Sequence, residues 1–209
     1  MPQSLRRITA ALVGSLCLAA CAQVQRTRPD GVAVAPMPKG GSVLQGRAPA
    51  AAAPVPPLPS TEVRDTLQRI NAYRAAGATC GTRRFEPAAP VAWNSLLAQA
   101  AQKHARDMAA RRAMSHTGSD GSSMSQRVTR EAYDFSTLGE NVSAGYTSVP
   151  DALAGWMRSA GHCANMMSPN FREVGVGGAV ASTSASVSVS AKGDTYGWYR
   201  AMVLGSRAR

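Results

Sequence analysis

Apolar residues recur at helical spacing from residue 63 onward, and this pattern predicts an amphipathic helix. The apolar face of this helix carries Val63, Leu67, Ile70 and Tyr73. Ser60 or Thr61 is a suitable N-cap, because either hydroxyl accepts a hydrogen bond from a free N–H of the first turn. Gly77 fits the C-terminal stop.

A second helix is expected from Asn94, its N-cap, to about Arg112. Its apolar face holds Leu97, Ala101, Ala105 and Met108. His104 lies on the same face, seven residues after Leu97. Two interpretations of His104 stay open: a core histidine with one hydrogen-bond partner, or a residue that lines a ligand cavity.

Two shorter helices are indicated mainly by their caps. Ser122 or Ser123 precedes a helical segment. That segment carries Met124, Val128 and Ala132. Ser148 begins the other helix, with Pro150 in its first turn and Asp151 completing a capping box. We expect this helix to end near residues 159–161.

The C-terminal part is typical of strands. Segment 174–180 contains three glycines, which indicate a close backbone approach or a bulge. Segment 185–190 alternates Ser and Val, and segment 196–204 is rich in aromatic residues. Three consecutive strands with short turns predict an antiparallel meander. Helices must cover it, so the expected fold class is an α+β sandwich.

The first 20 residues predict a signal peptide. Arg6 and Arg7 precede an apolar run, 8–18, that is too short to span a bilayer. The run ends in Leu18-Ala19-Ala20-Cys21, which resembles a bacterial lipobox. This resemblance implies that Cys21 is acylated and becomes the mature N-terminus. The alternative is an ordinary signal peptide in which Cys21 is incidental.

Residues 21–59 are expected to be a lipidated cysteine followed by a disordered tether. Pro, Ala, Gly and Val dominate this segment, and no helical or alternating apolar pattern is present. Burial therefore cannot offset the entropy of ordering it. Residues 60–209 have the size of one domain.

The net charge of +11 is spread along the chain. No aromatic residues are interleaved with basic ones in the way that base stacking requires, which argues against a nucleic-acid partner. A basic surface suits anionic lipid headgroups or acidic cell-wall polymers, or it serves solubility alone.

Four cysteines are consistent with export. Cys17 leaves with the signal peptide and Cys21 is the proposed lipid site, so Cys80 and Cys163 remain for a disulfide in an oxidising compartment. The alternative is a pair of buried free thiols.

Candidate chemistry is concentrated in three short stretches. These are Ser115-His116, Gly139-Glu140-Asn141 and the run from Trp156 through Ser159 to His162. Side chains of these types can converge on one polar cavity, where they would hold a divalent metal, bind a small polar ligand or hydrogen-bond one another.

In this order the motifs resemble the bacterial branch of the CAP superfamily of cysteine-rich secretory, antigen 5 and pathogenesis-related proteins. The residues that carry the resemblance are Leu97, Ala100, Ala101, His104, Met108, Ser115-His116-Thr117-Gly118, Asp120-Gly121, Arg127, Gly139-Glu140-Asn141, Trp156-Met157-Arg158-Ser159-Ala160-Gly161-His162, Asn165, Gly175-Val176-Gly177 and Gly197-Trp198-Tyr199. The resemblance implies a three-layer α-β-α sandwich around a short antiparallel sheet.

Many members of this family line a central cavity with two His and two Glu, sometimes with bound zinc. The resemblance places His116 and Glu140 at two of these positions. Ser159 stands where the second Glu would fall, and residues 171–178 offer no clear counterpart of the second His. His162 is a nearby substitute. A site for Zn or another divalent metal would therefore use His116, Glu140 and His162.

The CAP resemblance implies a binding module, because relatives bind sterols, fatty acids or partner proteins, and the lipobox-like signal implies that it is anchored to a membrane. The expected ligand is a lipid, another small amphiphile or a cell-envelope component, and the expected place is the periplasmic side of a bacterial membrane. Ala22 is not an acid, which in a Gram-negative cell is compatible with outer-membrane sorting. Two alternatives remain: a cryptic hydrolase in the His116/Glu140/His162 cavity, metal-assisted or Ser/His-based, and a structural envelope protein. Asn141 and Ser159 would line the cavity, but no Gly-x-Ser-x-Gly elbow supports hydrolysis.

Overall fold

The computed structural model describes residues 22–26, 58–181 and 196–208. The helices are α1 Ser60–Ala76, α2 Ser95–Arg111, α3 Met124–Arg130, α4 Val149–Arg158 and α5 Ala160–Met167. The strands are β1 Ala22–Arg26, β2 Ala78–Cys80, β3 Arg83–Phe85, β4 Ala92–Trp93, β5 Phe135–Ala144, β6 Glu173–Val180 and β7 Trp198–Arg207. Strands β2 and β3 form a small hairpin, and the other five form one sheet in the order β1-β5-β7-β6-β4.

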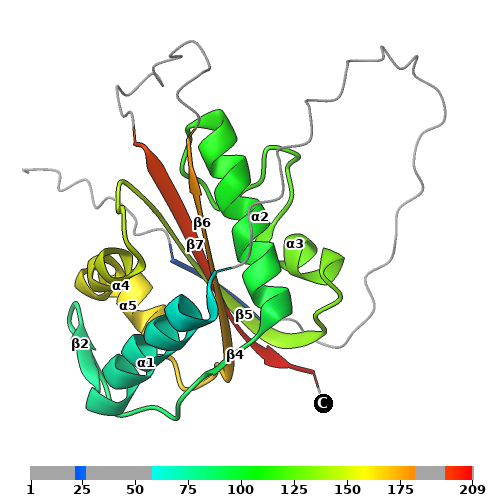
Figure 1. Cartoon of the computed structure of the whole chain (residues 1–209). Helices are drawn as coiled ribbons and strands as arrows, with labels where there is room; N and C mark the ends of the chain where they lie inside the picture. Colours follow the sequence, from blue (N-terminus) through cyan, green and yellow to red (C-terminus); the bar gives the residue numbers. More distant parts are fainter. Residues whose placement is uncertain (1–21, 27–57, 182–195, 209) are drawn as a thin grey trace, which may run out of the picture.

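The sheet lies between two helical layers (Figure 1). Helices α2 and α3 cover one face, and α1, α4 and α5 cover the other. Alternate residues of β7 supply both cores: Val203 packs with the α2 layer, whereas Leu204 packs with the α4 layer. Leu97 and Trp156 are the matching large side chains from the helices. The predicted α+β sandwich is confirmed.

The expected meander is corrected in its pairing. β6 is antiparallel to β7 directly, and the middle predicted strand, 185–190, lies outside the described residues. β7 is flanked on its other side by β5, a strand that the sequence did not predict. The sheet is also mixed, because β4 pairs in parallel with β6. An uninterrupted β5 was missed because polar residues occupy buried positions in it and obscure the alternation.

Close packing of α2 on β6 depends on two glycines. A Cβ atom on Gly175 would lie 2.0 Å from the backbone nitrogen of Ala98, and one on Gly177 would lie 2.3 Å from that of Gln102. Only a residue without a side chain allows such an approach. The expectation of a tight backbone approach in this segment is therefore confirmed.

Most helix ends follow the predicted signals. Asn94 accepts from the backbone N–H groups of residues 96 and 97, Ser123 forms a capping box, and Ser148 caps α4. The first helix differs, because Pro59 occupies its N-cap position and no side chain caps it. A further helix, which the sequence did not predict, also follows α4 almost at once. Ser159 is extended for one residue, and α5 begins directly after it.

Residues 22–26, expected to lie in a disordered tether, form a strand. β1 pairs antiparallel with β5, with Gln23 opposite Glu140. Ala22 and Val24 alternate with Gln23 and Gln25, but this pattern is short and lies in a segment rich in Pro, Ala and Gly, so the sequence analysis did not predict a strand. The signal peptide, Cys21 and residues 27–57 of the tether lie outside the described residues.

The expected disulfide joins Cys80 of β2 to Cys163 of α5, with 5.5 Å between their Cα atoms. It links the β2–β3 hairpin to the α5 layer across 83 residues of sequence. Among the described residues, no helix has both the length and the apolar character that a membrane crossing requires.

Candidate functional site

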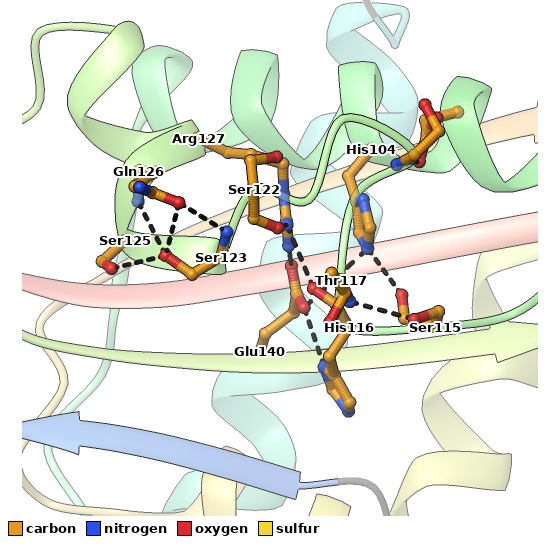
Figure 2. A network of polar contacts seen from close by, with 12 residues as sticks. His104, Ser115, His116, Thr117, Ser122, Ser123, Ser125, Gln126, Arg127 and Glu140 are labelled. Atoms are coloured by element: carbon orange, nitrogen blue, oxygen red, sulfur yellow. Dashed lines mark hydrogen bonds and ion pairs between the residues drawn. The ribbon is translucent and has the colours of Figure 1, made fainter. Parts of the chain in front are cut away.

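Glu140 is the centre of a buried polar network on the α2 side of the sheet (Figure 2). It lies in the middle of β5 and is 0% exposed. Its Oε1 accepts a hydrogen bond from Nδ1 of His116 at 2.8 Å, and its Oε2 accepts one from Arg127 at 2.7 Å. Nε2 of His104 lies 4.0 Å from Oε1. We call these four residues the carboxylate network.

Arg127 was not among the predicted site residues, although it donates a hydrogen bond to Glu140 at 2.7 Å. Helix α3 is positioned by the Ser123 capping box, and its buried face carries Met124, Arg127 and Val128. A charged residue on an otherwise apolar face is the signal that would have found it. The guanidinium also donates to the carbonyls of His116 (3.0 Å) and Ser122 (2.8 Å).

Loop residues 115–122 are therefore held from several sides. Nε2–H of His104 donates to the carbonyl of Ser115 at 2.8 Å, while Arg127 holds the carbonyls of residues 116 and 122. His104 is buried and its Nδ1 has no hydrogen-bond partner among the described residues. This agrees with the interpretation of His104 as a core residue with one partner.

Electrostatics keep the network ionised at Glu140 and neutral at His104. Burial acts to raise the pKa of Glu140, but the His116 hydrogen bond and the charge of Arg127 outweigh it, and the net pKa is lowered. Burial also lowers the pKa of His104, more than the nearby Glu140 carboxylate raises it. The carboxylate is thus a permanent anion that is compensated by a permanent cation.

The strand separates the predicted cavity residues. Leu138 and Val142, two residues before and after Glu140, pack in the α2-side core, so Glu140 points to that face and Asn141 to the opposite one. There Nδ2 of Asn141 donates to the carbonyl of His162 at 3.0 Å. Oδ1 of Asn141 accepts from Nδ2 of Asn165 at 3.0 Å.

The structure therefore brings His116 and Glu140 together and places His162 and Asn141 on the α5 side. In the part of the chain that the structure describes, no hydrogen bond or ion pair joins His162 to Glu140. Adjacent residues of a strand point to opposite faces of the sheet. The motif Gly139-Glu140-Asn141 does not reveal this separation unless it is known to lie in a strand.

The two candidate serines do not join a catalytic arrangement. Ser115 Oγ accepts from the backbone N–H of Thr117 at 3.0 Å. Ser159 lies at the α4–α5 junction, where its carbonyl accepts from the N–H of Cys163. Within the described ranges, neither hydroxyl is hydrogen-bonded to His116 or His162.

The donor set does not fit a divalent metal. No group of three or more His, Cys, Asp or Glu side chains is suitably placed for a metal ion in residues 22–26, 58–181 and 196–208. The Arg127 guanidinium, 2.7 Å from Oε2 of Glu140, already supplies the positive charge that a metal would bring. A zinc site also needs three protein ligands around one point, and His162 does not join the other two.

A separate groove lies between the start of α1 and the exposed side of α2. Its cavity volume is about 440 Å³. Apolar side chains dominate one part of its lining: Leu58, Val63, Trp93, Ala98 and Val176. Lys103 and Arg106 also line it, and no carboxylate is among its described lining residues. Lys103 additionally reaches Glu131 at 2.7 Å.

Solved structures with the same fold come from extracellular or surface proteins. An extracellular SCP-domain protein of Bacillus anthracis str. Ames matches with a TM-score of 0.54 and 21% identity, over 74% of this chain and 45% of its own. An outer surface protein of Borrelia burgdorferi matches with a TM-score of 0.52 and 14% identity, over 71% of this chain and 95% of its own. At these identities the likeness shows the fold alone.

Two curated relatives come from Bacillus subtilis (strain 168). The uncharacterized membrane protein YlbC is 30% identical over 89 residues, which is 43% of this chain and 26% of the relative. The uncharacterized protein YkwD is 26% identical over 110 residues, which is 52% of this chain and 43% of the relative. The matched region thus spans less than half the length of either relative.

Sequence comparison with family models gives the decisive match. The model of the cysteine-rich secretory protein family, CAP, matches residues 67–191, which is more than half of the chain. This range contains α2, α3, β5, α4, α5 and β6, and with them the whole carboxylate network. The chain belongs to the CAP family.

Proposed function

We propose that this protein is an exported, lipid-anchored CAP-domain protein of the cell envelope that binds a small amphiphile without converting it. The observation that carries the proposal is the groove between α1 and α2. A volume of about 440 Å³ falls within the range of ligand pockets, roughly 300–1,000 Å³. A pocket with apolar walls and a few polar groups suits a ligand with an apolar body and a polar head.

Charge supports an anionic head group. Lys103 and Arg106 line the groove without any carboxylate among the described lining residues. Their long apolar stems also extend the apolar surface. The ammonium of Lys103 is shared with Glu131, so Arg106 is the main candidate to contact a head group at the rim. The excess of basic residues over the whole chain acts in the same direction.

The carboxylate network supports a non-catalytic role. A general base must reach the substrate and have a pKa near the working pH, yet Glu140 is buried and the His116 hydrogen bond and the charge of Arg127 lower its pKa. The neighbouring serines are engaged in loop and helix-end contacts. The network is suited to holding residues 115–122 in place rather than to attacking a substrate.

Export and anchoring rest on the sequence and on the relatives. The apolar run and Cys21 are typical of a lipoprotein signal, and several acyl chains give stable membrane attachment. Relatives described as membrane, extracellular and outer surface proteins are consistent with this location. The disulfide between Cys80 and Cys163 suits an oxidising compartment such as the periplasm.

The proposal is tested by binding of a fluorescent fatty acid to the mature chain. Ala98→Trp places a large ring in the groove, whereas Ala110→Trp adds the same ring on the exposed side of the same helix, outside the groove lining. We expect Ala98→Trp to weaken binding at least about tenfold and Ala110→Trp to leave it unchanged. Equal affinities of both variants would reject the groove as the binding site.

A second experiment examines the protein purified from the cell envelope. Native mass spectrometry with elemental analysis of the envelope-purified chain should show acyl mass on the N-terminal Cys21 and a co-purified amphiphile. A stoichiometric metal and no organic ligand would contradict the proposed function.

A further inference from the structure

The outer edge of β5 is occupied by a segment from the chain's own N-terminal region. β7 pairs with one edge of β5, and β1 pairs with the other. The register places Ala22 opposite Asn141, Gln23 opposite Glu140 and Arg26 opposite Thr137. Figure 1 shows β1 (blue) lying along β5 at this end of the sheet.

Without β1, the centre of β5 would be an edge strand. Residues 138–141, which lie opposite β1, are buried, and an open edge would leave their outward backbone N–H and C=O groups without strand partners. Five residues of extended chain can satisfy them by backbone pairing alone. The short sequence of β1, AQVQR, is compatible with this pairing, because Ala22 and Val24 alternate with Gln23 and Gln25.

The position of β1 in the chain means that its pairing also changes the length of free chain between Cys21 and the domain. β1 begins directly after Cys21, and residues 27–59 connect it to α1. A docked β1 therefore holds the first mature residues against the sheet. When β1 is released, the whole of residues 22–59 becomes a spacer between Cys21 and the domain.

Docking of β1 is expected to be reversible. Its five residues form backbone bonds with one neighbouring strand only, and docking closes the long connection 27–59, which costs chain entropy. Short segments with few contacts open locally without unfolding the rest of a domain.

We propose that β1 is a releasable latch on the edge of β5 that sets the distance between the CAP domain and the membrane. The membrane part of this inference rests on the proposed lipid anchor at Cys21. In the docked state the sheet lies within a few residues of the anchored cysteine. In the released state the domain can reach on the order of 100 Å, at about 3.1 Å per residue of extended tether.

The latch lies beside the carboxylate network. Glu140 lies opposite Gln23 of β1, and its carboxylate accepts hydrogen bonds from His116 and Arg127. In Figure 2 the ring of His116 lies on the side of β5 along which β1 runs. Opening of β1 therefore exposes the backbone of the strand that carries the network, while Arg127 still holds the loop from the other side.

Hydrogen exchange of the mature chain with Cys21→Ser tests the latch without a membrane. The variant Gln23→Pro/Val24→Pro removes two adjacent N–H donors of β1, of which at least one faces β5. The matched control, Ala51→Pro/Ala52→Pro, makes the same change in the tether. We expect exchange of the backbone amides in 138–142 to rise at least about tenfold in the β1 variant only.

Two outcomes would overturn the latch. One is equal exchange of 138–142 in the β1 variant, the control and the parent chain. The other is protection of 138–142 that increases with protein concentration, because β1 would then dock on a second copy rather than on its own domain. Urea unfolding of the β1 variant should keep the parent's midpoint, which separates release of the latch from global unfolding.

The distance between domain and membrane is measured with the acylated chain in vesicles. A dye on Thr129→Cys, on the exposed side of α3, transfers energy to labelled lipid. We expect lower transfer in the β1 variant than in the tether control, and equal transfer would contradict the membrane role. Fatty-acid binding by the groove is a separate readout, so its loss would reject the proposed ligand and leave the latch result standing.

Discussion

The helical layers on the two sides of the sheet hold two polar networks that differ in their charge balance. On the α2 side, the carboxylate network pairs Arg127 with Glu140. On the other side, Arg74 is 0% exposed and donates to the carbonyls of Ala89, Met166, Ser168 and Phe171. We call Arg74 and these four carbonyls the carbonyl network. Among the described residues, Arg74 has no carboxylate partner.

This difference separates a structural cross-link from a site near the surface. Arg74 joins α1 to the C-terminal end of α5 and to the chain before β4, and burial lowers the pKa of its guanidinium. The carboxylate network instead reaches the surface at His116, whose side chain is 11% exposed. A buried charge is therefore not by itself a mark of function. Both networks hold backbone carbonyls. Of the two, only the carboxylate network includes an imidazole ring that is partly exposed, that of His116.

The largest effect is expected from Arg74→Met. The substitution removes the donor from four carbonyls, of which those of Met166 and Phe171 are in buried hydrogen bonds, at about 1–3 kcal/mol each for those that cannot find water. We expect the free energy of unfolding to fall by about 4 kcal/mol or more in urea titration. Arg74→Lys, which keeps the charge and fewer donors, should lose less. Equal losses in both variants would show that the charge, rather than the set of donors, matters here.

A smaller loss is expected from Glu140→Gln. The amide is nearly isosteric, but it leaves Arg127 buried without a counter-charge, which costs about 3 kcal/mol. In a double-mutant cycle with Arg127→Met, the double variant should lose less than the sum of the single losses by about 1–3 kcal/mol. Strict additivity of the unfolding free energies would contradict the pairing of these two residues.

The smallest effect concerns pH. His104 is held neutral in the folded state, while its unfolded pKa is near 6.5, so the unfolded chain binds more protons below that pH. Stability is complete above about pH 6.5 and falls on acidification, at up to about 1.4 kcal/mol per pH unit. His104→Gln should flatten the slope of unfolding free energy between pH 7 and 5. An unchanged slope would show that His104 does not titrate in this way.

Local signals in the sequence predicted much of the fold. Asn94, Ser123 and Ser148 fixed three helix starts, because capping depends only on the next few residues. Gly175 and Gly177 indicated that another backbone segment approaches closely, but they did not indicate that this segment is α2. The disulfide followed from counting cysteines in a chain whose signal-like start predicted export.

What the sequence could not show depends on contacts between distant residues. The pairing of Arg127 with Glu140 requires knowledge of how α3 packs on β5. Separation of Glu140 from His162 follows from the alternation of a strand that was not predicted. Strand β1 pairs with β5, which is more than 100 residues away in the sequence, and backbone groups that can form such a pairing are present in every residue except proline.

The central claim is a division of roles: the carboxylate network holds the loop 115–122, whereas the groove holds the ligand. Fatty-acid affinity measured side by side for Glu140→Gln and Ala98→Trp tests it most directly, at a temperature at which both variants are folded. We expect Glu140→Gln to retain the parent's affinity within about twofold and Ala98→Trp to lose at least about tenfold. Loss of binding in Glu140→Gln with retention in Ala98→Trp would contradict the claim.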